Sequence, residues 1–198
     1  AVKVNSGVTL ANNAALGSAN GAITNAGTIN SNADYIKGTV ANSGSLNLSG
    51  GTLNKAVSGN GTTTISGNTT NNAGINQGVN VNSGVTLTNN AALGSDSGKV
   101  TNAGTINTNA NNIKGAVTNN NTVNLSGGTL SKAISGSGTT NITGIVSSNS
   151  AISQAISIAS AGDLTISASN VGGNVTNAGD LILNGGTLTK AVTGAGTT

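Results

Sequence analysis

Asp163 and Asp180 are the residues whose type and spacing could support chemistry. An internal repeat places them at the same position of adjacent units. In neighbouring parallel strands their carboxylates would lie about 5 Å apart, near the separation of the two carboxyl groups of a retaining glycosidase. Alternatively, oxygen atoms of the two aspartates and of nearby threonines could hold a Ca²⁺ ion weakly. The simplest interpretation is that both aspartates are solvated.

The composition excludes most enzyme chemistry. The 198-residue chain contains no Cys and no His, and it also lacks Glu and Arg. It therefore offers no thiol or imidazole for nucleophilic catalysis, general-base catalysis or zinc binding. Two like charges stacked directly on each other also repel. The sequence thus predicts a protein that is not an enzyme, with no catalytic, cofactor-binding or metal-binding residues.

Charged residues are few, which limits the possible partners. Seven lysines and four aspartates give a net charge of +3, and the lysines are scattered. This is not the basic patch of a protein that binds nucleic acid. No run approaches the roughly 18 apolar residues of a membrane span, so we expect no membrane insertion of this segment. The absence of Cys fits a reducing compartment and fits equally a surface protein that is secreted unfolded.

The chain consists of two long repeats and a shortened third. Residues 4–80 recur as residues 81–157 at an offset of 77, and residues 158–198 form the third copy. The offset is visible in TNAGTIN, at 24–30 and 101–107, and in LSGGTL, at 48–53 and 125–130. The third copy follows at an offset of 58, because it lacks one of the smaller units into which each copy divides. We interpret residues 1–198 as one segment of a longer chain.

A finer period divides each long copy into four units. Each unit opens with a branched apolar residue, and successive openings are 19, 17, 17 and 24 positions apart. The eleven openings are Val4, Ile23, Val40, Val57, Val81, Val100, Val117, Ile134, Ile158, Val175 and Val192. A second apolar position follows six positions later, although it is Thr63, Thr140 and Thr198 in the last unit of each copy. A third position, such as Ile36 or Leu53, lies four positions before the next unit.

These three apolar positions, separated by corners rich in Asn, Ser and Gly, predict three short strands in each unit. Stacked units would place each position on its equivalent about 4.8 Å away, with backbone hydrogen bonds along the axis. The sequence therefore predicts an all-β fold, a parallel β-solenoid or β-helix with a roughly triangular section. It would have about eleven coils of 17–24 residues and right-handed winding, because parallel crossovers favour that hand. We expect Val4, Ile23, Val40 and Val57 to stack inward in one column.

One outward position is unusually uniform. The residue before the second apolar position is Thr or Ser in nine of eleven units, and it is Asp163 and Asp180 in the other two. The hydroxyl residues are Thr9, Thr28, Ser45, Thr62, Thr86, Thr105, Thr122, Thr139 and Thr197. A β-branched hydroxyl suits a half-exposed strand, and an ordered array of hydroxyls could also bind ice or sugar. A flat ice-binding face would need two parallel Thr columns, whereas the neighbouring outward column is mixed.

Two further features of the repeat lead to predictions. Asparagine recurs at corners, at Asn25, Asn42, Asn102, Asn119 and Asn177. These side chains could form stacked amide ladders, local turn hydrogen bonds, or both. The 24-residue units should carry their extra residues as outward bulges or as an added face, around residues 67–76 and 144–153. Any lateral contact surface is expected there.

The repeated strand–turn–strand phrase resembles sequences of a known class of bacterial surface proteins. VTNAGTIN at 100–107, and its longer forms at 117–130 and 175–188, resemble passenger domains of bacterial autotransporter and filamentous-haemagglutinin-like adhesins. The resemblance covers the whole chain and rests on composition and coil length. It implies a right-handed β-solenoid rod that is exported through an outer-membrane barrel and displayed at the cell surface. The chain itself contains no recognisable export domain, barrel or receptor-binding loop.

The repeat and this resemblance together predict a non-catalytic rod or stalk in an extracellular bacterial adhesin or fibre. Expected partners are host or bacterial surface ligands and other copies of the rod, associated end to end or laterally. One alternative is the scaffold of a carbohydrate-active β-helix protein, which acidic clusters in flanking sequence would reveal, and another is an ice-binding solenoid. The repeat stops in mid-strand at Thr198 and neither end has a polar cap. We therefore expect the repeat to continue in the parent protein, or copies to stack into a filament.

Overall fold

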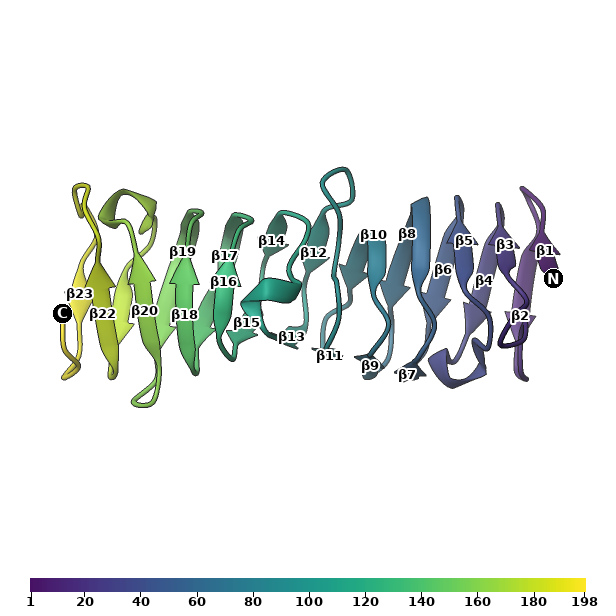
Figure 1. Ribbon diagram of the computed structural model, residues 1–198, viewed down its shortest axis with the longest axis horizontal. Coiled ribbons are helices and arrows are strands. Elements are labelled where there is room, and N and C mark those ends of the chain that lie inside the picture. Colours follow the sequence, from purple (N-terminus) through teal and green to yellow (C-terminus); the bar gives the residue numbers. More distant parts are fainter.

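The computed structural model describes all 198 residues as one continuous coil of chain. Short strands wind around a single axis, and the two termini lie at opposite ends of the rod (Figure 1). Neighbouring strands pair in parallel throughout, and about eleven coils stack along the axis. The prediction of a parallel β-solenoid is therefore confirmed.

The strands form three ladders, which we name faces A, B and C. Face A contains β1 (Val2–Val4), β3 (Ile23–Asn25), β5 (Val40–Asn42), the first parts of β8 (Val57–Ile65) and β10 (Ile75–Val81), and then β16 (Gly128–Leu130), β18 (Ile145–Ser148), β20 (Asp163–Ile166) and β22 (Asp180–Leu183). Face B contains β2 (Thr9–Asn12), β4 (Thr28–Ser31), β6 (Ser45–Leu48), the second parts of β8 and β10, β12 (Val100–Asn102), β14 (Val117–Asn119), and the first parts of β17 (Ile134–Ile142) and β19 (Ile152–Ile158). Face C contains β7 (Gly51–Leu53), β9 (Thr69–Asn71), β11 (Thr86–Asn89), β13 (Thr105–Thr108), β15 (Thr122–Leu125), the second parts of β17 and β19, β21 (Val175–Asn177) and β23 (Val192–Thr193).

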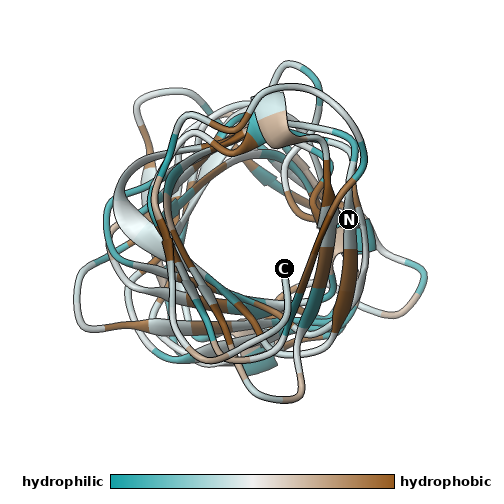
Figure 2. Ribbon diagram, turned by 90° about the vertical axis from the view of Figure 1, so that its left-hand side faces the viewer, coloured by the Kyte–Doolittle hydropathy of each residue, from teal (hydrophilic) through white to brown (hydrophobic).

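Each strand has one side toward the axis and one side toward solvent. In β13, Ile106 and Thr108 are buried, whereas Thr105 and Asn107 are partly exposed, as the two-residue period of a strand requires. The apolar side chains among those that face inward form a single cluster of 37 buried residues, all Val, Ile, Leu or Ala. In the end-on view the coils superpose around this core, and short loops project outward (Figure 2). The core is narrow, so compact aliphatic side chains fill it.

The 77-residue repeat is four coils plus one face, so each copy is turned by a third of a turn relative to the one before. β3 on face A corresponds in sequence to β12 on face B. Likewise β4 on face B corresponds to β13 on face C, and β7 on face C corresponds to β16 on face A. Positions that are equivalent in sequence therefore lie on different sides of the rod.

The extra face arises where β10 stacks on β8. β8 turns the corner between faces A and B with Gly59, Asn60 and Gly61, whereas β10 turns it with Gln77 alone. The coil that starts at Val57 closes at Ile75, the partner of Val57, and Val81 lies one face further on. β17 and β19 show the same shift in the second copy.

The 24-residue units are therefore ordinary coils followed by an additional face. The predicted outward bulges around residues 67–76 and 144–153 are wrong, because residues 69–71 form β9 and residues 145–148 form β18, both paired in ladders. The alternative of an added face is confirmed.

Three short 3₁₀ helices make the rotation visible. They are η1 (Ala33–Tyr35), η2 (Ala110–Asn112) and η3 (Ala168–Asn170). They occupy equivalent positions of the three copies, yet they lie at the lower edge, in the middle and at the upper edge of the rod (Figure 1). Ile113, directly after η2, bridges Leu93 on face A, and Val171, directly after η3, bridges Ile152 on face B. Each helix thus marks a different corner.

The predicted inward column is wrong at its first member. Ile23, Val40 and Val57 stack as expected, but Val2 rather than Val4 pairs with Ile23. Val4 is buried too, and it pairs with Asn25. The same two-residue displacement occurs at two later openings. Val79 rather than Val81 pairs with Val100, and Ile156 rather than Ile158 pairs with Val175. Residues two apart face the same side of a strand, so the apolar pattern does not distinguish them.

Candidate functional site

Asp163 and Asp180 lie side by side on face A, in β20 and β22, as the repeat predicted. Their outward column continues to Ile145 on one side and to Thr197 on the other. Asp163 is partly exposed and Asp180 is exposed. Nowhere in the chain do three or more His, Cys, Asp or Glu side chains gather. The arrangement is two carboxylates held at strand spacing and open to solvent.

Replacing Asp163 with threonine, the commonest residue at this position, should raise the free energy of unfolding by about 0.5 kcal/mol, because like charges on directly paired strands repel. Urea unfolding followed by circular dichroism measures the change, once in EDTA and once in Ca²⁺. A cation held between Asp163 and Asp180 would reverse the result: Ca²⁺ would stabilise the natural chain, and the variant would lose that effect.

The outward hydroxyl column is divided among the three faces. The members from the first copy stack on face B, and are Thr9, Thr28, Ser45 and Thr62. Those from the second copy stack on face C, and are Thr86, Thr105, Thr122 and Thr139. The last three, Asp163, Asp180 and Thr197, stack on face A. The single column expected from the repeat is therefore wrong, because the rotation moves each copy to the next face.

The neighbouring outward column on face C contains mainly asparagine. Its members beside the four threonines are Thr88, Asn107, Asn124 and Asn141. Threonine occupies both columns only in the coil of Thr86 and Thr88. The two parallel Thr columns that an ice-binding face would need are thus absent from this face.

The corner asparagines form buried amide ladders. Asn25 Nδ2 donates to Asn42 Oδ1 at 2.6 Å, and Asn102 Nδ2 donates to Asn119 Oδ1 at 2.7 Å. All four side chains are almost completely buried. Asn71 donates in the same way to Asn89, at 2.7 Å. The predicted ladders are therefore confirmed in both long copies.

The same amides also close the corners. Asn102 Oδ1 accepts from the backbone N–H of Gly104 at 3.1 Å. Asn102 Nδ2 donates to the carbonyls of Gly104 and Thr122 at 3.0 and 2.9 Å. One buried side chain thus satisfies backbone hydrogen-bonding groups of a turn and links two coils. The expected turn hydrogen bonds are therefore confirmed beside the ladders.

Gln77 and Gln154, which sequence analysis did not single out, end the two ladders. Both are buried at the corner where the extra face begins. In the orientation that satisfies both ends of its amide, Gln77 Oε1 accepts from Asn42 Nδ2 at 2.8 Å and from the Thr63 hydroxyl at 2.7 Å. Gln154 makes the same contacts with Asn119 and Thr140. These bonds explain why Thr63 and Thr140 replace an apolar residue at the second position. One feature of the sequence could have drawn attention to them: the chain has only two glutamines, and they lie at equivalent positions of the two long copies.

Sequence analysis also missed two polar grooves, one in each long copy. Groove 1 lies on face B beside η1, is lined by Asn30 and Asn47 among others, and has a volume of about 570 Å³. Groove 2 lies on face C beside η2, is lined by Asn107 and Asn124 among others, and has a volume of about 690 Å³. The two pairs of asparagines are equivalent in the repeat, so the rotation places the two grooves on different sides of the rod.

Asparagine side chains in the grooves are linked along the rod. Asn47 Nδ2 donates to Asn30 Oδ1, and Asn124 Nδ2 donates to Asn107 Oδ1, each at 2.7 Å. Asn141 continues the second ladder by donating to Asn124 at 2.8 Å. An amide has two N–H groups and an oxygen that can accept twice. Each groove therefore retains donors and acceptors for another molecule.

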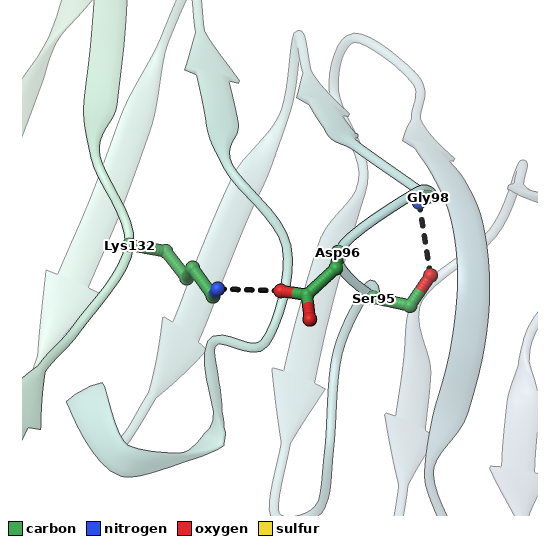
Figure 3. A network of polar contacts seen from close by, with 4 residues as sticks. All are labelled: Ser95, Asp96, Gly98 and Lys132. Atoms are coloured by element: carbon green, nitrogen blue, oxygen red, sulfur yellow. Dashed lines mark hydrogen bonds and ion pairs between the residues drawn. The ribbon is translucent and has the colours of Figure 1, made fainter.

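A surface ion pair joins two distant loops. Lys132 donates to the carboxylate of Asp96, which lies in the loop closed by the hydrogen bond from Gly98 N to Ser95 Oγ at 2.9 Å (Figure 3). The hydrogen bond and the positive charge of Lys132 hold the pKa of Asp96 below its ordinary value. The Asp96 side chain is 88% exposed, so water and salt screen the pair and it contributes little to stability.

The helices of this chain are single turns of three residues, and none is long and apolar enough to cross a membrane. Comparison of the chain with family models, with curated proteins and with solved structures finds no match. Its function is therefore inferred from its own residues and from the way the solenoid arranges them.

Proposed function

We propose that this chain is a stiff, non-catalytic rod segment of an extracellular bacterial adhesin or fibre. The observation that carries the proposal is the continuity of the structure: strands pair coil to coil along three faces, and one apolar cluster of 37 buried residues runs inside them. In such a solenoid each coil contacts only its neighbours, so added coils lengthen the rod without changing its section. The mechanical role is to hold a binding region away from the cell.

The direction of the hydrogen bonds suits this role. Backbone bonds between coils run along the rod axis, and 59 of the 120 backbone hydrogen bonds lie within the strand ladders. Bending the rod would stretch these bonds on one side and compress the packed core on the other. About eleven coils at about 4.8 Å each give a reach of roughly 50 Å.

Surface chemistry supports display outside the cell. The outward columns of faces B and C consist largely of threonine, serine and asparagine, which are uncharged and can hydrogen-bond to water and to their stacked neighbours. The resemblance to autotransporter and filamentous-haemagglutinin-like passenger domains points in the same direction. Host or bacterial surface ligands, and other copies of the rod, are the partners that this role implies.

Immunogold electron microscopy of intact producing cells tests the proposal. An antibody raised against residues 1–198 should label the outside of unpermeabilised cells, and external protease should remove the label. An antibody against a cytoplasmic enzyme is the control, since it should label only permeabilised cells. Label that appears only after permeabilisation would refute a surface role.

A further inference from the structure

Groove 1 has the shape of a site for an extended molecule. Asn30, Asn47 and Thr64 follow one another on three successive coils of face B, and all three line the groove. Three coils span about 10 Å along the rod. Tyr35, from η1, lines the groove as well. The groove thus runs along the axis, with a row of polar side chains and an aromatic ring.

The lining of groove 1 is polar but uncharged. None of its twelve residues carries a charge, and ten of them are not hydrophobic. The nearest acidic residue in sequence, Asp34, accepts a hydrogen bond from the backbone N–H of Thr52 at 2.9 Å and does not line the groove. An ionic ligand would find no counter-charge here. A neutral ligand that both donates and accepts hydrogen bonds would match the amides.

Tyr35 distinguishes groove 1 from groove 2. It is the only aromatic residue of the chain, and 38% of it is exposed. The equivalent residue in groove 2 is Asn112, at the same position of the second copy. A tyrosine presents an apolar ring together with a polar hydroxyl. The ring gives groove 1 an aromatic surface, whereas no hydrophobic residue lines groove 2.

The geometry points to a binding site for a neutral, linear oligosaccharide in groove 1. The apolar C–H face of a sugar ring would stack on Tyr35, and hydroxyl groups of successive sugars would bond to the amides of Asn30 and Asn47. A few precisely placed polar groups fix orientation in ligand sites, while apolar contact supplies much of the affinity. The groove is open and holds one ring, so we expect weak, millimolar binding. This inference concerns groove 1 alone and stands or falls independently of surface display.

Tyr35 also provides the readout. The chain has no Trp and no other Tyr, so its intrinsic fluorescence reports this groove directly. The probes are neutral oligosaccharides with different linkages, namely cellohexaose, maltohexaose and N-acetylchitohexaose, titrated into residues 1–198. At least one should change the fluorescence saturably and show saturation transfer by NMR. A sulfated heparin fragment is the charged comparison, and it should not compete.

Variants separate the groove from the rest of the surface. By NMR, Tyr35→Ala should weaken binding by about tenfold, whereas Tyr35→Phe, which keeps the ring, should retain most of it. Asn112→Tyr should add a second site in groove 2. Tyr35 is exposed, so the unfolding curves of the variants should match that of the natural chain. The inference is overturned if no probe binds, if Tyr35→Ala binds as tightly as the natural chain, or if the heparin fragment competes.

Discussion

Asn102→Ala is expected to lower the free energy of unfolding by about 3 kcal/mol, because a buried polar group left without its partner costs about 1–3 kcal/mol and several partners are affected. The variant removes the acceptor of the Gly104 N–H and the donor to Asn119 Oδ1. It also removes the donor to the Thr122 carbonyl. Asn102 is fully buried, so water cannot readily replace these bonds. Urea unfolding followed by far-ultraviolet circular dichroism measures the loss.

Asn107→Ala is the matched control for this prediction. Asn107 belongs to the same strand–turn–strand phrase and accepts from Asn124 at 2.7 Å, but it lies on the outward side and is partly exposed. Water can replace Asn107 as the partner of Asn124, so the free energy of unfolding is expected to fall by less than about 1 kcal/mol. Equal losses for the two variants would show that the inward ladder has no special role in stability.

Gly104→Ala is expected to lower the free energy of unfolding by about 3 kcal/mol, near the upper end for overpacking. An added Cβ would lie 2.2 Å from the carbonyl oxygen of Val85 and 2.4 Å from that of Asn82. Both atoms belong to the backbone of the coil next to it, so relief requires the coils to separate. The expected signs are a lower urea midpoint and faster amide exchange in residues 82–85 and 100–105.

Gly78→Ala tests whether close stacking, rather than the loss of a glycine, causes this effect. At Gly78 the nearest atoms to an added Cβ are 3.6 Å away, which is ordinary contact. Alanine there should leave stability unchanged or raise it by about 0.5 kcal/mol, because it restricts the unfolded chain. A loss at Gly78 as large as that at Gly104 would contradict the stacking argument.

The main features of the fold could be predicted from periodicity. Branched residues recur at fixed spacings, and Ile23, Val40 and Val57 do stack in one column. The register at Val4 could not be fixed, because Val2 and Val4 are both apolar and both face inward. The 24-residue spacing was ambiguous for a related reason. An apolar residue about every six positions opens each face, so spacing alone does not tell a long coil from a coil plus a face.

The residue that decides the register is Gln77, a polar residue inside the rod. It is the single corner residue of β10, where β8 has a three-residue corner, and it hydrogen-bonds to Asn42 and Thr63. The periodicity of the sequence is a pattern of apolar positions. A single polar residue in each copy does not alter that pattern, so its role in setting the register was not recognised. The grooves were missed because their lining comes from successive coils and from a corner helix, which the chain brings together only when it is wound. The column of Asp163 and Asp180 was predictable, because both lie after the last shift of register.

A change in the number of copies would alter two properties of any group that the rod carries at its end. It would change the direction in which the group points around the rod axis, and it would change the group's distance along that axis. Each 77-residue copy advances the rod by four coils and one face, about 21 Å, and turns everything beyond it by a third of a revolution. Three copies bring a surface feature back to the same side. Loss of one unit, as in the third copy, removes a whole coil and shortens the rod without turning it. Recombination between repeats could thus change the length of the rod with or without rotating the group at its end.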